Sequence, residues 1–264
     1  MRFELDGSEG TVSVRLWEHP GARRVVVIAH GYGEHIERYD HVARALGERG
    51  AAVYGPDHLG HGRSAGERVL IADFEHVVDD LVRVVERARA AYPGLPAVLL
   101  GHSMGGLIAT RLAQRANRPP LVGLVLSGPA IGLGPAMEQM IAADFIDQPL
   151  DVTALSRDPA VGDAYAADPL VWHGAWKVPT ITALARAQEA VERGPGFGDL
   201  PLLWIHGTED PLVPIALVRP AVERLRGAHF TAHEHEGGRH ETFNEVDRER
   251  AIDALCAFVE RVAP

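Results

Sequence analysis

The chain has 264 residues, 46% of them hydrophobic and 23% charged, and this composition is ordinary for a folded globular protein. Its net charge of −10, without a cluster of basic residues, argues against a nucleic-acid partner and against electrostatic attachment to an anionic membrane. The single cysteine, Cys256, excludes an internal disulfide and is expected to be a buried packing residue.

The first residues lack the basic-then-apolar layout of a signal peptide, and no apolar run reaches transmembrane length. We therefore expect a cytoplasmic protein that contacts membranes at most peripherally. The sequence leaves the oligomeric state open.

Strands and helices alternate through the first half of the chain. Predicted strands cover 11–17, 23–30, 51–54, 98–101 and 123–127, and predicted helices cover 40–49 and 73–92. The run from Val25 to Ala29 is continuously apolar and rich in β-branched residues, which is typical of a strand covered on both faces. The alternation predicts right-handed βαβ units and a mostly parallel, doubly wound sheet.

The alternation of predicted strands and helices stops between residues 128 and 198, where aspartates and prolines interrupt short helical patterns. The alternation then resumes with a strand over 202–207, a helix over 216–226, a strand over 229–235 and a terminal helix over 247–262. We therefore predict one α/β core, residues 1–128 and 199–264, with residues 129–198 inserted as a cap. Open α/β sheets bind ligands at the carboxyl ends of their strands, so the cap is expected to cover that edge.

The pattern Gly-x-Ser-x-Gly, formed by Gly101, Ser103 and Gly105, stands between a predicted strand and a predicted helix. A strand that reverses directly into a helix is crowded at the turn, and glycines on both sides of the serine relieve the crowding. The turn would present the Ser103 hydroxyl near the positive end of a helix. The pattern is weak by itself, because many serines only cap helices. It needs a base, an orienting acid and oxyanion donors.

Later parts of the chain offer these partners. His240 follows a predicted strand and can act as the base that a serine nucleophile requires. Glu209 and Asp210 both follow the strand over 202–207, and either carboxylate can orient an imidazole. The glycine-bearing turn after the strand over 23–30 can aim a backbone N–H at a developing oxyanion, alongside the N–H of Met104.

Most of the 14 histidines have simpler interpretations. Four of them lie beside or close to glycine in predicted turns, and no spacing among them matches a zinc site, so no metal is expected. These four are His30, His58, His61 and His102. His233 and His235 alternate on a predicted strand and are expected to face solvent.

Four motifs together resemble the monoacylglycerol lipases, a serine-hydrolase family within the α/β-hydrolases. The motifs are His30-Gly31-Tyr32-Gly33-Glu34-His35, Asp57-His58-Leu59-Gly60-His61-Gly62-Arg63-Ser64, Gly101-His102-Ser103-Met104-Gly105-Gly106 and His240-Glu241-Thr242-Phe243-Asn244-Glu245. The resemblance extends from about Val25 to Phe258. It is strongest to bacterial members, because segments 155–159 and 165–171 of the insertion match as well.

The resemblance implies an α/β-hydrolase fold with a cap after the sixth strand. It implies hydrolysis of monoacylglycerols to glycerol and a free fatty acid through an acyl-enzyme, without a cofactor. Ser103 becomes the nucleophile, Asp210 the acid and His240 the base, in the chain order typical of this fold. The backbone N–H groups of Tyr32 and Met104 become the oxyanion hole.

The resemblance also suggests that Glu34, Arg38 and Tyr165 lie at the glycerol end of the pocket. An alternative stays open: Glu34 and Arg38 form an ion pair that braces the oxyanion turn, and Tyr165 only packs the cap. Tyr32 is bulkier than the residue expected after His-Gly, and its ring is expected to narrow the entrance. The insertion is shorter than in several relatives, which leaves the acyl-chain length open.

Five apolar residues of the cap are expected to line an acyl tunnel and to contact a lipid surface transiently, or else only to pack the cap on the core. They are Met137, Met140, Ile141, Phe145 and Ile146. A small lipid ester is the expected substrate. A general carboxylesterase or a lysophospholipase would use the same machinery, and a non-catalytic lipid-binding relative is a more remote alternative.

Overall fold

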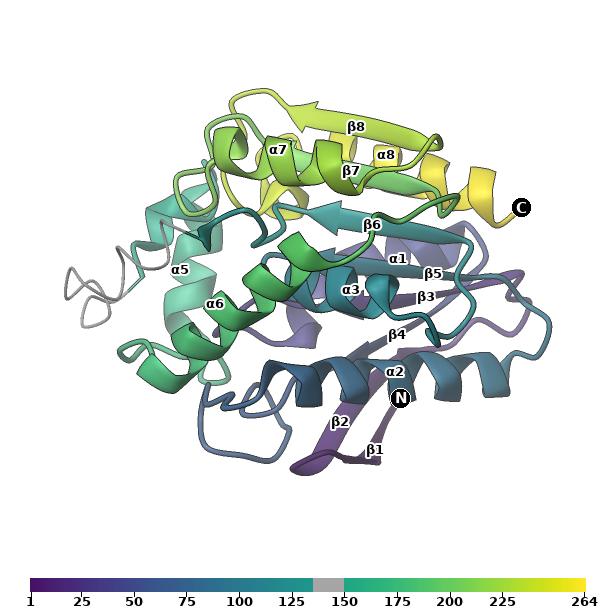
Figure 1. The fold of residues 1–264 in the computed structure, drawn as a ribbon, viewed down its shortest axis with the longest axis horizontal. Helices are drawn as coiled ribbons and strands as arrows, with labels where there is room; N and C mark the ends of the chain where they lie inside the picture. The colour runs from purple at the N-terminus through teal and green to yellow at the C-terminus, as the bar shows by residue number, and fades with distance from the viewer. Residues whose placement is uncertain (135–149) are drawn as a thin grey trace.

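A computed structural model describes residues 1–134 and 150–264 of the chain. Within these residues, eight strands form one sheet that lies between two layers of helices (Figure 1). The strands are β1 (Arg2–Gly7), β2 (Gly10–Trp17), β3 (Arg24–Ala29), β4 (Ala51–Pro56), β5 (Ala97–His102), β6 (Gly123–Ser127), β7 (Leu202–Gly207) and β8 (Phe230–His235). Their order across the sheet is β1-β2-β4-β3-β5-β6-β7-β8.

Strand β2 is antiparallel to β1 and β4, and all other neighbouring strands are parallel. The predicted mostly parallel, doubly wound sheet is therefore confirmed. Every residue of β3 and β5 is buried, as expected for central strands with helices on both faces. Their carboxyl ends, at Ala29 and His102, lie beside each other at one edge of the sheet.

Helices cover both faces of the sheet. Helices α1 (Asp40–Glu48) and α8 (Glu249–Val262) pack on one face, and α2 (Phe74–Ala91), α3 (Met104–Gln114) and α7 (Ile215–Leu225) pack on the other. The bounds of α1, α2, α7 and α8 agree with their predicted ranges within two residues, because each has a clear apolar face. Cys256 is buried in α8, as predicted.

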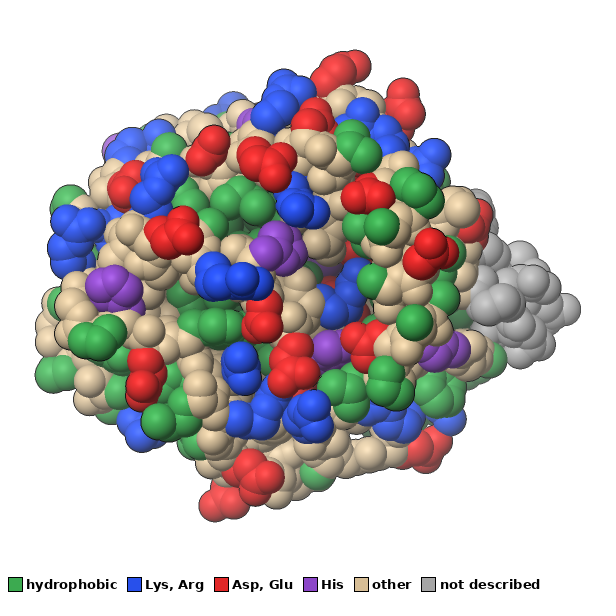
Figure 2. All heavy atoms as spheres, turned by 180° about the vertical axis from the view of Figure 1, so that it is seen from behind, with side chains coloured by type: hydrophobic (Ala, Val, Ile, Leu, Met, Phe, Trp, Pro, Cys, Tyr) green, Lys and Arg blue, Asp and Glu red, His purple; other side chains and the backbone are tan. Residues whose placement is uncertain are grey.

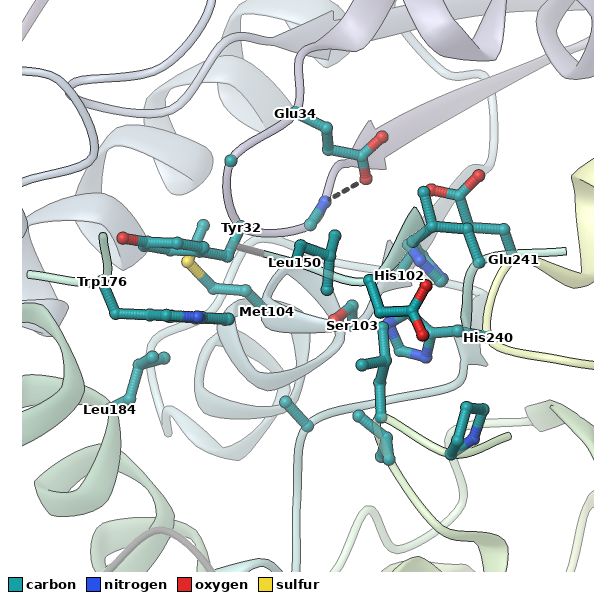
Figure 3. A pocket seen from close by; sticks show the side chains of 18 of the residues that line it. Tyr32, Glu34, His102, Ser103, Met104, Leu150, Trp176, Leu184, His240 and Glu241 are labelled. Carbon is teal, nitrogen blue, oxygen red and sulfur yellow. Dashed lines mark hydrogen bonds between the residues drawn. The ribbon is translucent and has the colours of Figure 1, made fainter. Parts of the chain in front are cut away.

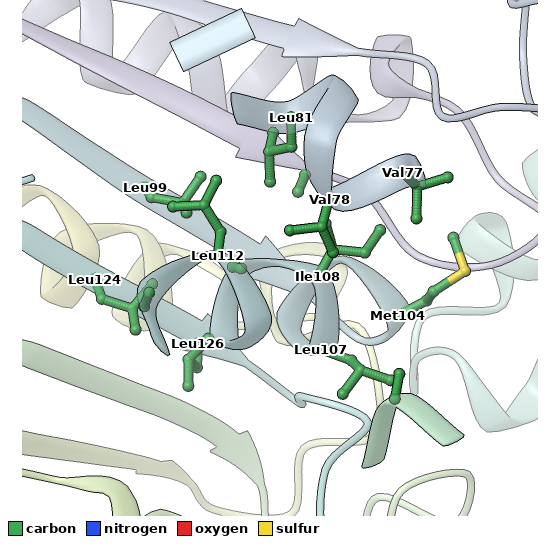
Figure 4. Packing of buried hydrophobic residues seen from close by; sticks show 14 of the residues in the cluster. Val77, Val78, Leu81, Leu99, Met104, Leu107, Ile108, Leu112, Leu124 and Leu126 are labelled. Carbon is green, nitrogen blue, oxygen red and sulfur yellow. The ribbon is translucent and has the colours of Figure 1, made fainter. Parts of the chain in front are cut away.

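Helix α3 is enclosed between the sheet and α2 (Figure 4). Its residues Leu107, Ile108 and Leu112 are wholly buried, next to Leu99 of β5 and Val78 of α2. Burying one such side chain contributes about 1.5–3 kcal/mol. This packing fixes the first turn of α3, and therefore the residue just before it, at the carboxyl edge of the sheet.

Two features differ from the sequence interpretation. Strand β1 was not predicted, although Phe3 and Leu5 alternate with polar residues; it pairs antiparallel with β2. The expectation that His235 faces solvent is wrong. Its side chain is fully buried at the end of β8, where its Nε2 lies 2.8 Å from Asp247 Oδ1. The loop that follows β8 folds back over this end of the strand and excludes water from the ring.

The described part of the insertion follows β6, the sixth strand. It contains the short 3₁₀ helix η3 (Val152–Ala154), α5 (Pro159–Ala167) and α6 (Val178–Arg193). Figure 1 shows α5 beside the carboxyl ends of the strands, while α6 packs against the buried core beside α3. The predicted apolar stripe, Met137, Met140, Ile141, Phe145 and Ile146, lies outside the described residues.

The surface carries charges of both signs. Acidic and basic side chains are interspersed across the face seen in Figure 2. In the part of the chain that the structure describes, none of the helices combines the length and the apolar character needed to cross a membrane. Cytoplasmic location and the absence of a nucleic-acid partner stay predictions.

Candidate active site

Ser103 lies in the tight turn between β5 and α3. Its backbone has φ 53° and ψ −118°, a left-handed conformation that is strained for a non-glycine residue. A Cβ at Gly101 would lie 2.3 Å from the carbonyl oxygen of Gly105, and a Cβ at Gly105 would lie 2.1 Å from that of Ala29. Both glycines of the motif are therefore sterically required. The Ser103 N–H donates to Ser127 O at 3.0 Å, which holds the turn against β6.

His240 and Asp210 form a buried pair beside this turn. The Nδ1 of His240 lies 2.7 Å from Oδ2 of Asp210, and Oδ1 of Asp210 accepts the backbone N–H groups of Leu212 and Val213, each at 2.9 Å. With the Nδ1–H of His240 donating to the Asp210 carboxylate, Nε2 is the ring nitrogen left to accept a proton. Ser103 and His240 lie close together on the wall of one cavity (Figure 3).

The choice that the sequence left open between two carboxylates has a geometric answer. Glu209 is exposed, and within residues 1–134 and 150–264 its one hydrogen bond is the backbone N–H donating to Gly238 O at 3.0 Å. Asp210 turns inward because the residues after it form a tight turn that donates to its carboxylate. Of the two acids, Asp210 is therefore the one that contacts His240.

The environment separates the pKa values of these groups. Burial lowers the pKa of His240. The negative charge of Asp210 and the hydrogen bond to it raise this pKa by more than burial lowers it, so the net shift is upward. Burial raises the pKa of Asp210, yet the His240 charge and the hydrogen bond from His206 hold it well below its usual range. Burial, followed by the charge of His240, lowers the pKa of the neighbouring His102 to about 4, so His102 is neutral at pH 7.

The turn over residues 30–33, which we call the oxyanion turn after its predicted role, lies against Ser103. A Cβ at Gly31 would come within 3.2 Å of the Ser103 Cβ. Tyr32 and Met104 both line the cavity, and none of the hydrogen bonds among the described residues uses their backbone N–H groups. These two N–H donors, next to a strained serine, can hydrogen-bond to a substrate oxygen on which negative charge develops, and so stabilise it.

A buried ion network lies under the oxyanion turn. One oxygen of Glu34 accepts the Gly31 N–H at 2.6 Å and the Tyr39 hydroxyl at 2.8 Å, and the other accepts Arg38 at 2.7 Å. Arg38 also donates two hydrogen bonds to Glu241, at 2.6 and 2.7 Å. Arg38 thereby links the oxyanion turn to the residue that follows His240.

Of the three residues suggested for the glycerol end, Glu34 and Tyr165 line the cavity, whereas Arg38 is not among its lining residues. The Arg38 guanidinium lies over the Tyr165 ring, 4.8 Å from its centre. The ion pair between Glu34 and Arg38, which was the alternative expectation for these residues, is thus present. Sequence reasoning missed Glu241, although its place directly after His240 was a usable signal.

The cavity has a volume of about 620 Å³ and two unlike ends. Figure 3 shows Trp176 and Leu184 on one side of Ser103, and His240 with Glu241 on the other. Among the other lining residues, Ile181, Leu184 and Val213 belong to the buried cluster against which Trp176 and Tyr32 pack, whereas Leu150 and Leu155 cluster with Tyr165. The site therefore offers an apolar arm and a short polar end that meet at the serine.

Tyr32 does not project freely into the entrance. Its ring stacks on Trp176 with centroids 4.2 Å apart and an angle of 6° between the planes. The insertion and the oxyanion turn thereby share one wall of the cavity. Trp176 was not singled out from sequence, because only the tertiary structure brings it to Tyr32.

The glycine-flanked histidines do not form a cation site. His30, His58 and His61 cluster beneath the oxyanion turn, where burial lowers the pKa of His58 to about 3 and of His61 to about 4. The Nε2 of His30 accepts the His58 N–H at 3.0 Å, and its Nδ1 lies 2.7 Å from Gly31 O. Across residues 1–134 and 150–264, no group of ligating side chains has the geometry to hold a metal ion.

Comparisons with known proteins agree with this geometry. The profile of the family described as serine aminopeptidase, S33, matches residues 20–247. The chain is 38% identical over 248 residues to the monoacylglycerol lipase of Mycolicibacterium smegmatis, covering 90% of this chain and 88% of that protein. The chain belongs to the monoacylglycerol lipase family.

Other members of this family are also similar. Human monoglyceride lipase is 34% identical over 245 residues, covering 88% of this chain and 80% of the human protein. The crystal structure of a soluble variant of Saccharomyces cerevisiae monoglyceride lipase, in complex with a substrate analogue, superposes with a TM-score of 0.87 at 21% identity, covering 99% of this chain and 95% of that one. The fold is therefore the α/β-hydrolase fold, and the protein is a serine ester hydrolase of this family.

Proposed function

We propose that the chain hydrolyses monoacylglycerols to glycerol and a free fatty acid through an acyl-enzyme intermediate. The observation that carries the proposal is the shape of the cavity, in which a strained serine stands between an apolar arm and a short polar end. A single acyl chain with a small polyhydroxyl head has this same division. The names of the bacterial and mammalian relatives support the proposal.

In the proposed mechanism, Ser103 Oγ attacks the ester carbonyl carbon while His240 Nε2 takes the hydroxyl proton. The N–H groups of Tyr32 and Met104 bind the resulting oxyanion, and one such donor is typically worth about 3 kcal/mol. His240 then returns the proton to the departing glycerol oxygen, which leaves an acyl-serine. A water molecule, activated by His240, releases the fatty acid, and Asp210 stabilises the imidazolium in both halves.

The polar end is proposed to hold the glycerol group. Glu34, Glu241 and Tyr165 line this end, and carboxylate and hydroxyl groups can hydrogen-bond to the hydroxyls of glycerol. Burial raises the pKa of Glu241, but the charge and hydrogen bonds of Arg38 outweigh this effect and lower the pKa to about 2. The carboxylate is therefore ionised at neutral pH and accepts hydrogen bonds. Arg38 is proposed to act without touching the substrate, by holding both carboxylates in place.

The apolar arm is proposed to hold the acyl chain. Residues 129–198 are proposed as the cap, since their described part supplies Trp176, Ile181 and Leu184 to this arm. Transient contact of the cap with a lipid surface would bring the substrate to the arm from a bilayer or micelle. A small lipid ester is then the partner that reaches the site.

A head-group panel tests the proposal. We expect kcat/KM for monoolein to exceed that for lysophosphatidylcholine and for p-nitrophenyl butyrate by about tenfold or more, which is about 1.4 kcal/mol of transition-state discrimination. Ser103→Ala should abolish hydrolysis of monoolein while circular dichroism stays unchanged. Faster hydrolysis of lysophosphatidylcholine would indicate a lysophospholipase, and a preference for the butyrate a general carboxylesterase. Failure of Ser103 to react with a fluorophosphonate probe would indicate a non-catalytic relative.

A further inference from the structure

A short part of the insertion, residues 153–157, lies along the loop that carries His240, residues 239–245. We call these the anchor segment and the histidine loop. The N–H of Glu241 donates to Leu155 O at 2.8 Å, and the N–H of His240 donates to Ala154 O at 3.4 Å. The Ser156 hydroxyl donates to Asn244 O at 2.9 Å. The backbone on both sides of the proposed base is thus held by the insertion.

One ion pair joins the two segments through side chains. The side chain of Glu245 is fully buried, and it accepts Arg157 Nε at 2.9 Å and the N–H of Arg239 at 2.7 Å. Arg157 also donates from Nη2 to Asp247 at 2.6 Å. Glu245 therefore holds at once the anchor segment and the residue that immediately precedes His240.

The burial of Glu245 makes this pair more than a surface contact. Removing Arg157 would leave the Glu245 charge buried without its partner, which is strongly destabilising. The planar guanidinium of Arg157 reaches two carboxylates at once, which a lysine ammonium cannot do with the same geometry. Neither Arg157 nor Glu245 is among the residues that line the described cavity.

We propose that Arg157 and Glu245 are a positioning pair that sets the geometry of His240 and makes the reactivity of Ser103 depend on the anchor segment. The inference rests on the proposed role of His240 as base. A displacement of about 1 Å at a reacting group can lower the rate about a hundredfold, so a small shift of the histidine loop has a large effect. The effect extends to substrates too short to reach the apolar arm.

The test measures kcat and KM separately, on the short ester p-nitrophenyl butyrate. We expect Arg157→Met to lower kcat about tenfold or more and to change KM by less than about twofold, because orientation is lost and binding is not. Arg157→Lys should recover part of the loss, since it restores the charge but not the planar fork. Arg193→Met is the matched control: its partner Glu189 lies 3.4 Å away on the exposed face of α6, so kcat should not change.

A double variant separates positioning from folding. Arg157→Met with Glu245→Gln removes both charges and leaves none buried alone, so its melting temperature should exceed that of Arg157→Met. Its kcat should nevertheless stay low, because the link to Arg157 is missing. Both variants are assayed at a temperature where circular dichroism shows folded protein. The inference is overturned if either Arg157→Met or the double variant has a kcat within about twofold of the kcat of the natural chain. An increase confined to KM would also overturn it.

His240→Ala keeps the two proposals apart. If this variant is inactive while Arg157→Met retains full kcat, the positioning role falls and the proposed function stands. If His240→Ala retains full activity, the proposed function falls, and the positioning role falls with it.

Discussion

The reactivity of the site depends first on how single residues are held. His240 is buried, and its pKa is raised because Asp210 outweighs the effect of burial. Asp210 is in turn fixed by two backbone N–H groups, so it cannot rotate away from the ring. His102, whose ring centre is 4.8 Å from that of His240, stays neutral and adds no competing charge.

The raised pKa of His240 predicts the pH dependence of the enzyme. In the proposed mechanism only the neutral imidazole of His240 accepts the serine proton, so kcat/KM should rise with pH and reach half of its maximum above pH ~6.5, the ordinary pKa of histidine. Asp210→Asn removes the charge that raises this pKa, so the midpoint should move to lower pH, and the rate should fall by about 10⁴. Titration of His240 by NMR and the pH–rate profile measure the two effects.

Glu209→Gln is the matched control for this substitution. Its carboxylate is exposed and one residue away from Asp210, so the midpoint should not change. An unchanged His240 titration in Asp210→Asn would contradict the assigned electrostatic role.

At the scale of elements, the strand–turn–helix of β5 and α3 depends on close backbone approach. The first turn of α3 passes so near the end of β3 that only glycine fits at position 105. The helix cannot retreat, because its other face is packed against α2. Strain at Ser103 is thus maintained by burial on both sides of the helix.

We expect Gly105→Ala to lower the free energy of unfolding by at least about 1–3 kcal/mol, because the new methyl would overlap the Ala29 carbonyl. Gly47→Ala in α1 is the control, since a Cβ there meets nothing within 4 Å. That change should stabilise by about 0.4–1 kcal/mol. Urea unfolding measures both, and equal stability of the two variants would contradict the steric argument.

For the whole molecule, the insertion and the core build the cavity together. The backbone N–H of Trp172 donates to Gly33 O at 2.7 Å, Trp176 stacks on Tyr32, and the Lys177 N–H donates to the Tyr32 hydroxyl at 3.4 Å, so the insertion contacts the oxyanion turn at several points. The anchor segment contacts the histidine loop on the other side of Ser103. Residues 150–198 therefore border the reacting groups and not only the apolar arm.

Trp176→Ala should change chain-length preference. Loss of the indole removes apolar wall from the arm, so KM for long-chain esters should rise about tenfold, equivalent to about 55 Å² of buried apolar surface, while KM for butyrate esters changes little. Trp17→Ala, on β2 and outside the cavity, is the control for losing a tryptophan. Equal increases for short and long esters would show that Trp176 only braces Tyr32.

Much of the fold and the site was readable from sequence because its signals are local. Residue spacing predicts the apolar run of β3 and the apolar faces of α2 and α8. The glycines two positions before and after Ser103 predict the tight turn around it. The order of Ser103, Asp210 and His240 at strand ends was readable for the same reason, since parallel strands end at a common edge.

What sequence reasoning missed depends on contacts between distant segments. The burial of His235 requires the following loop to fold back over β8, and no pattern within the strand indicates this. The stack of Trp176 on Tyr32 and the link between Arg157 and Glu245 each join segments 88 or more residues apart. Local spacing reports which face of an element is apolar, whereas the partner of a buried charge or ring is chosen only when the chain is packed.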